Sequence, residues 1–127
     1  MPDQETLAFA AQLFDLAREG DASQLAAYLD AGVPADLTND KGDTLLLLAA
    51  YHRQADAVRV LLARGADVAR VNDRGQTALA AAVFRSDAEI VRLLLDAGAS
   101  PSDGGPSALE TARFFDLPEM VALLQRG

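Results

Sequence analysis

Apolar residues recur at helical spacing in short stretches of this chain, and polar residues rich in glycine and aspartate separate the stretches. In one stretch Leu46, Ala49 and Ala50 fall at positions i, i+3 and i+4, and the apolar positions within residues 58–62 repeat that spacing. A helix places such positions on one face. The pattern therefore predicts a series of short amphipathic helices joined by turns.

Glycines after the Leu-rich stretches give the pattern a fixed period. Gly32, Gly65 and Gly98 stand 33 residues apart, and each can end a helix in the left-handed backbone conformation. The turn sequence Asp-Lys-Gly-Asp-Thr at 40–44 recurs as Asp-Arg-Gly-Gln-Thr at 73–77. A period of this length indicates a stacked repeat array. Because a side chain resists the left-handed conformation, we expect Gly65→Ala to destabilise the array.

These motifs resemble the ankyrin repeat. The turn half of that repeat contains Gly-x-Thr, as at residues 42–44, and the second half runs Val-x-x-Leu-Leu-x-x-Gly-Ala-Asp, as at residues 58–67. The resemblance implies an all-α fold, an ankyrin-repeat α-solenoid of stacked helix-turn-helix units with short turn fingers. Because each unit is too small to bury its own apolar face, stability is expected to come from stacking neighbouring units.

The resemblance covers nearly the whole chain, which we predict to be a single domain, 1–127. The expected copies are a degenerate first one at 5–38, full ones at 39–71 and 72–101, and a truncated last one at 102–127. The Thr-Pro-Leu-His segment of the family lacks its proline and histidine here. We still expect the hydroxyl groups of Thr44 and Thr77 to cap their helices.

The two ends of the array carry apolar residues of their own. The first helix is expected to supply the core of an N-terminal cap: Phe9, Leu13, Phe14 and Leu16. Pro118 suits the first turn of the last helix, because its missing N–H costs little there. The last helix is expected to leave an apolar outer face: Leu117, Met120 and Leu124. A homodimer through this end would follow, so we expect a monomer or weak homodimer.

Composition restricts the setting and the partner. No stretch approaches the roughly 20 apolar residues of a transmembrane helix, and the start lacks the basic region of a signal peptide, so we expect a cytoplasmic protein. Its Ala, Leu and Arg bias favours a bacterial source. The formal net charge is −8. We therefore expect no nucleic acid partner, and a basic or neutral partner instead, although acidic composition also serves solubility.

Catalytic constellations are scarce. His52 is the single histidine and there is no cysteine, so the common nucleophile-and-base pairs and zinc sites cannot be assembled. Two carboxylate pairs could act as acid and base, Asp15 with Glu19 and Asp87 with Glu89, but we expect them on solvated helix faces or turn ends. We therefore expect no enzyme and no cofactor. The minor alternative, a metal-dependent enzyme, would show thermal stabilisation by Mg²⁺, Ca²⁺ or Zn²⁺.

One position near the end of each first helix is aromatic in three copies. Tyr51, Phe84 and Phe114 occupy it, and His52 and Arg85 follow the first two. In ankyrin arrays this region and the turn tips line the concave groove where partners bind, so the resemblance implies a ladder of exposed rings. It also implicates six turn-tip residues: Asp40, Lys41, Asp43, Asp73, Arg74 and Gln76. Alternatively, the rings pack on each other or on the neighbouring helix pair, with Phe115 in the core of the last repeat.

We therefore expect a non-catalytic module that binds a partner protein through the groove and turn tips, away from any membrane. Aromatic residues and Arg are the usual anchors of such interfaces. The alternative is a self-assembling structural protein that associates through its terminal repeats. A molar mass that rises with concentration would favour that alternative.

Overall fold

The computed structural model describes residues 4–126. Within that range the chain forms eight helices, joined by turns and loops with two isolated β-bridges. The helices are α1 Gln4–Glu19, α2 Ala22–Asp30, α3 Leu45–Tyr51, α4 Ala55–Ala63, α5 Ala78–Phe84, α6 Ala88–Asp96, α7 Ala108–Phe114 and α8 Pro118–Arg126. The all-helical fold that the periodicity predicted is confirmed, and α8 begins at the expected proline.

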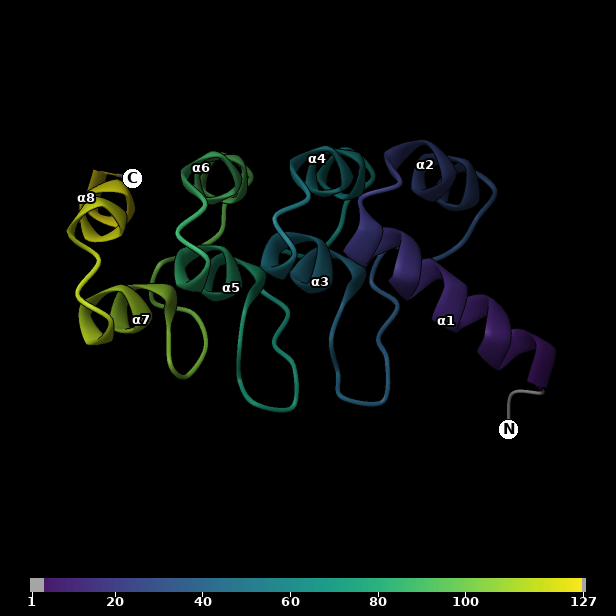
Figure 1. Cartoon of the computed structure of the whole chain (residues 1–127), viewed down its shortest axis with the longest axis horizontal. Helices are drawn as coiled ribbons and strands as arrows, with labels where there is room; N and C mark the ends of the chain where they lie inside the picture. The colour runs from purple at the N-terminus through teal and green to yellow at the C-terminus, as the bar shows by residue number, and fades with distance from the viewer. Residues whose placement is uncertain (1–3, 127) are drawn as a thin grey trace.

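The helices alternate between two rows (Figure 1). The first helices of successive pairs, α1, α3, α5 and α7, form one row, and the second helices, α2, α4, α6 and α8, form the other. Each helix packs against its partner in the pair and against its neighbours in the same row. The two ends of the chain lie at opposite ends of the array. Stacking of pairs therefore builds one continuous core, as a repeat array requires.

Three loops extend away from both rows, and we call them fingers (Figure 1). They contain residues 39–43 before α3, residues 72–76 before α5, and residues 103–106 before α7. Each finger leads directly into a first helix. The candidate site lies between the fingers and the first-helix row.

Side-chain caps fix the starts of the helices that follow the fingers. The hydroxyl groups of Thr44 and Thr77 accept hydrogen bonds at 3.0 Å and 3.1 Å from backbone N–H groups in the first turns of α3 and α5, as predicted. Ser107 caps α7 in the same way, and its own N–H donates to the Glu110 carboxylate at 2.9 Å. These bonds satisfy backbone donors that a helix start leaves without a partner.

The two central first helices, α3 and α5, are almost completely buried. In α3 and α5 every residue before the last is buried: Leu45–Ala50 and Ala78–Val83. The second helices bury a narrower stripe, such as Val58 and Leu61 in α4 and Ile90 and Leu94 in α6. In these two central first helices only the last residue, Tyr51 or Phe84, is exposed at the surface.

The C-terminal end differs from the sequence-based expectation. Met120 and Leu124 are each 3% exposed and Leu117 is half-buried, so these residues do not form an apolar outer face. Residues four apart lie on one side of a helix. On α8 that side packs toward α6 and α7, which draws both side chains into the core.

The N-terminal helix follows the prediction except at one residue. Leu13, Phe14 and Leu16 are buried in the core, as expected. Phe9 is 39% exposed and meets the ring of Tyr28 edge-on, with the centroids 5.2 Å apart. Phe9 therefore covers the flank of α2 and does not belong to the core that α1 shares with α3.

Candidate functional site

A groove of about 550 Å³ lies between the fingers and the ends of the first helices. Its walls combine apolar helix residues with polar finger residues. The residues that line the groove include Arg18, Asn39, Lys41, Asp43, Tyr51, His52, Asn72, Arg74, Gln76, Phe84 and Phe115. Many of the residues that the sequence singled out therefore come together in one place, although they belong to separate repeats.

Three rings form what we call the aromatic row: Tyr51, Phe84 and Phe115. The rings of Tyr51 and Phe84 are stacked, with centroids 6.2 Å apart and planes at 9°. Phe115 meets Phe84 edge-on at 5.3 Å. The three residues are 38%, 47% and 49% exposed. Each ring thus packs with part of its surface against a neighbouring ring and leaves another part exposed in the groove. The rings therefore both pack on each other and remain accessible to a partner.

Besides the stack of Tyr51 on Phe84, two contacts join a ring to the following position in the next repeat. Arg85 follows the ring position of its own helix, and its guanidinium carbon lies 5.2 Å from the centroid of the Tyr51 ring in the preceding repeat. Phe115 holds the equivalent place one repeat later and packs on Phe84. The turns after α3, α5 and α7 are alike, because each contains one residue at positive φ: Arg53, Ser86 and Asp116.

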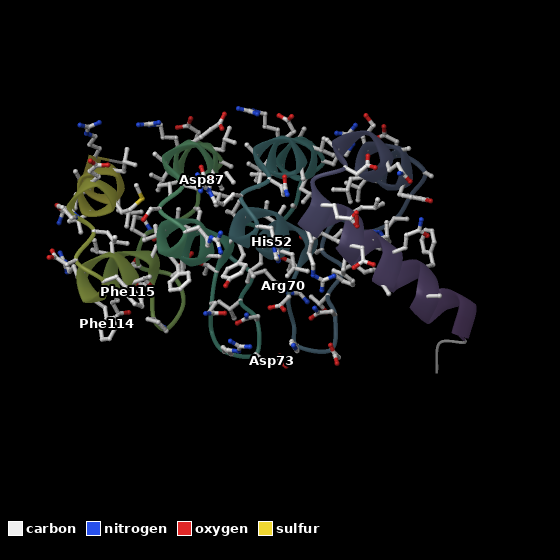
Figure 2. The ribbon with its side chains drawn as sticks, viewed as in Figure 1. His52, Arg70, Asp73, Asp87, Phe114 and Phe115 are labelled. Atoms are coloured by element: carbon white, nitrogen blue, oxygen red, sulfur yellow. The ribbon has the colours of Figure 1, made fainter. Side chains whose placement is uncertain are left out.

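Phe114 stands apart from the row, contrary to the expected ladder. It is 82% exposed and meets only the ring of Phe115 among the aromatic residues that the structure describes, at 4.9 Å. Figure 2 shows the two rings at the end of the array, with Phe114 beyond Phe115. Within residues 4–126 no later repeat supplies a residue that could cross over Phe114 as Arg85 crosses Tyr51. The expectation that Phe115 lies in the core is also wrong, because its ring is 49% exposed and packs on Phe84 in the aromatic row.

His52 lies beside the row, where Figure 2 labels it near the middle of the array. Its ring meets the edge of Tyr51 with the centroids 5.3 Å apart. Partial burial lowers the pKa of His52 from its usual 6.5, and the positive charges of Arg18 and Arg85 lower it further. The imidazole is therefore neutral at pH 7, and it can both donate and accept a hydrogen bond in the groove.

We expect proton NMR to place the pKa of His52 below 6.5 in the folded chain. Because it is the single histidine, its ring signals are unambiguous. Arg85→Gln removes one repelling charge and should raise the pKa, whereas Arg92→Gln on the second-helix row should leave it unchanged. Since the folded pKa lies below the unfolded one, the stability that His52 contributes is complete above pH 6.5 and is lost as the pH falls through the folded pKa.

Two asparagines that the sequence analysis passed over hold the fingers in shape. The Asn39 side-chain oxygen accepts from the N–H groups of Lys41 and Asp43 at 2.9 Å and 3.0 Å. Asn72 repeats this in the next finger, accepting at 3.0 Å and 2.9 Å. Their recurrence 33 residues apart was the sequence signal that could have identified them. Both asparagines line the groove, so its finger wall is preformed.

Hydrogen bonds also join one finger to the next. The Asn72 amide nitrogen donates to Asp43 at 2.8 Å and to Gln76 at 2.9 Å. The backbone N–H of Asp73 donates to the Lys41 carbonyl at 3.0 Å. Asp43 and Gln76, both expected to contact a partner, therefore have their side chains engaged within the fingers.

The other four expected turn-tip residues are exposed: Asp40, Lys41, Asp73 and Arg74. Figure 2 shows Asp73 at the tip of its finger. Lys41 and Arg74 line the groove, whereas Asp40 and Asp73 do not. The two fingers thus turn their basic residues toward the groove.

None of the four carboxylates that could be drawn as catalytic pairs lines the groove, and Asp15, Asp87 and Glu89 are engaged by neighbouring groups. Asp15 forms an ion pair with Arg18 at 2.9 Å. Asp87 caps α6 and pairs with Arg53, and Glu89 pairs with Arg59. Among the residues that the structure describes, no group of three or more His, Asp and Glu side chains is arranged to hold a metal ion. None of the described helices is both long and apolar enough to cross a membrane.

Comparison with known proteins agrees with the repeat architecture. A family model described as "Ankyrin repeats (3 copies)" matches residues 13–124. A curated relative from Pseudomonas aeruginosa, whose name describes it as an ankyrin repeat protein, is 53% identical over 58 residues. Those residues make up 46% of this chain and 34% of the relative, so the match spans about a third of the relative's length.

Proposed function

The chain belongs to the ankyrin-repeat family, and from that premise we propose that it is a non-catalytic module that binds a partner protein in the groove between its fingers and first helices. The partner rests its apolar side chains on the aromatic row. Lys41, Arg74 and Arg85 contact its polar groups. Ankyrin repeats generally serve protein–protein interaction. We place the module in the cytoplasm of a bacterium, without cofactor or nucleic acid, which fits its bacterial relative and its net charge of −8.

The observation that carries this proposal is the aromatic row itself. A contiguous strip of three rings, each between about a third and a half exposed, lies in a groove whose opposite wall is polar and hydrogen-bonded. Large rings with part of their surface in water are the usual energetic centre of protein interfaces, and a polar rim around them is the usual surrounding. A row serving packing alone would be expected to bury its rings.

The direct test is capture of partners from a bacterial lysate by the wild-type chain and by a Tyr51→Ala, Phe84→Ala, Arg85→Ala variant. Truncating one interface anchor costs about 2 kcal/mol or more, so we expect the variant to bind at least about thirtyfold more weakly. Its helical content should match the wild type, because all three residues are exposed. A control with Arg92→Ala, Gln125→Ala and Arg126→Ala changes the second-helix row and should retain the partner.

Equal capture by the groove variant and the wild type would contradict the proposal and move the site elsewhere. Loss of helical content in the groove variant would instead show that the rings are needed for packing. Circular dichroism on all three proteins separates these outcomes before any capture is compared.

A second candidate is self-assembly through the C-terminal end, and the exposure of Phe114 favours it. At the same end of the array a hollow of about 400 Å³ is lined by apolar residues, Ala112, Leu117, Pro118, Val121 and Ala122, together with Arg113, Asp116 and Gln125. A second copy could cover this face. Light scattering over rising concentration would show a growing molar mass, and Val121→Glu should abolish the growth. A constant monomer mass would dismiss this candidate.

A further inference from the structure

Ion pairing of the basic residues differs between the second-helix side and the groove side of the chain. On the second-helix side three arginines are neutralised by carboxylates of a neighbouring repeat: Arg53 by Asp87, Arg59 by Glu89 and Arg64 by Asp30. Arg59 also pairs with a carboxylate of its own helix. These three arginines are therefore compensated across the stack, whereas Arg92 and Arg126 of the same row form no ion pair with a described side chain.

On the groove side the cations are left without such compensation. Among the side chains that the structure describes, Lys41, Arg74 and Arg85 form no ion pair, although all three are exposed. Arg18 also lines the groove and pairs only with Asp15, at 2.9 Å. Arg18, Lys41 and Arg74 line the groove, whereas Arg85 is outside the lining and lies over the ring of Tyr51.

The one carboxylate in the groove lining is already engaged. Asp43 accepts hydrogen bonds from the side-chain amides of Asn72 at 2.8 Å and Asn39 at 3.4 Å. Three cationic side chains, Arg18, Lys41 and Arg74, face that single carboxylate across the lining. The groove is therefore locally positive within a chain whose formal net charge is −8.

We propose that the groove binds an acidic segment of a partner protein, one whose carboxylates flank an apolar or aromatic side chain. The inference rests on the proposed function and specifies the partner's chemistry. The carboxylates contact Lys41, Arg74 and Arg85, and the apolar side chain lies on the exposed faces of Tyr51 and Phe84. The guanidinium carbon of Arg85 lies 5.2 Å from the centroid of the Tyr51 ring, and Arg85 forms no ion pair with a described side chain, so its N–H groups can donate to a carboxylate of the ligand.

The charges that line the groove affect a bound ligand more than the net charge of the chain does. Interactions between exposed charges are largely screened beyond about 8 Å at physiological ionic strength. The acidic residues of the second-helix side therefore act weakly on a ligand that touches the groove cations directly. Asp40 and Asp73 lie next to Lys41 and Arg74 in the fingers but outside the groove lining. They would repel an acidic surface that extends beyond the groove, so the groove favours a short acidic segment. This reverses the basic or neutral partner that net charge alone favoured.

The binding test uses a short synthetic peptide of glutamates and aspartates with a central phenylalanine. It is titrated into isotope-labelled protein and followed by NMR. Three comparison probes are the same peptide with lysines in place of the acids, the acidic peptide with a central glycine, and a single-stranded thymidine oligonucleotide. The acidic phenylalanine peptide should shift the signals of the aromatic row. It should also raise the pKa of His52, because a carboxylate nearby favours the protonated ring.

Variants of the protein locate the charge effect. Lys41→Glu with Arg74→Glu should weaken the acidic peptide by about tenfold or more, since each exposed pair is worth up to about 1 kcal/mol and each reversal turns attraction into repulsion. The control Arg92→Glu with Arg126→Glu changes the net charge equally on the second-helix row and should leave the affinity nearly unchanged. Equal weakening by both pairs would mean nonspecific attraction and would overturn the inference.

The remaining outcomes separate this inference from the proposed function. Binding of the lysine peptide to the aromatic row would keep the groove as a protein-binding site and overturn its acidic preference. Binding of the oligonucleotide in place of the peptide would overturn the protein partner as well. Shifts from neither peptide would overturn the acidic-segment inference, whereas lysate capture that depends on Tyr51 and Phe84 would still support the proposed function.

Discussion

Leu79→Ala is expected to lower the free energy of unfolding by about 3 to 5 kcal/mol. Leu79 is 1% exposed in α5, which packs between α3 and α7 and against α6. Truncation removes apolar contacts and leaves a cavity that flanking helices cannot easily fill, because they are held by their own neighbours. Total stabilities are typically about 5 to 15 kcal/mol, so this one change would remove a large share. Urea denaturation followed by circular dichroism measures it.

The same substitution at a half-buried leucine provides the control. Leu95 lies in α6 of the same repeat and is only partly buried. Leu95→Ala should cost clearly less, because part of its side chain is in water in the folded state. Equal losses at Leu79 and Leu95 would contradict the enclosure of α5 between its two neighbours.

The architecture could be predicted from the sequence because the same local information appears several times. The periodic glycines and apolar positions identified stacked helix pairs, and the structure and the family match confirm them. The caps at Thr44 and Thr77 were predictable for a similar reason. A hydroxyl residue directly before an apolar helical stretch interacts with that helix alone, so local sequence suffices.

The aromatic row was predicted only in part, because its contacts join different repeats. Superimposing the repeats correctly placed Tyr51 and Phe84 at equivalent positions, and their rings do stack. Superposition also aligned Phe114 with them. At the last repeat, however, the ring that packs on Phe84 comes from the following position, Phe115. A period describes which positions are equivalent, and it does not describe which neighbours touch.

The charge of the groove could not be read from the sequence for a related reason. Net charge sums over the chain, whereas the ion pairs between neighbouring repeats depend on which side chains face each other across the stack. Arg64 and Asp30 are 34 residues apart and yet meet at 2.9 Å. Lys41 and Arg74 of the groove are among the cations that remain without an ion pair to a described side chain.

Gly75→Ala is expected to lower the free energy of unfolding by about 3 kcal/mol, through two effects at the same position. Gly75 has φ +78°, where a side chain costs about 1 to 2 kcal/mol. A Cβ there would also lie 2.7 Å from the carbonyl oxygen of Gly105 in the next finger. That contact would push the fingers apart and weaken the hydrogen bond from the Gly105 N–H to the Gly75 carbonyl, worth about 0.5 to 1.5 kcal/mol.

Gly65→Ala isolates the conformational part of this loss. Gly65 has a similar φ of +83°, but nothing lies within 4 Å of a Cβ built there. Its substitution should therefore cost only about 1 to 2 kcal/mol, in the direction that the sequence predicted. Urea denaturation of both variants gives the difference, which measures the contact between fingers. Because Arg74 precedes Gly75, Gly75→Ala should also weaken binding of an acidic peptide, whereas Gly65→Ala should not. Equal effects of the two substitutions on stability and on binding would show that the fingers are not held to one another.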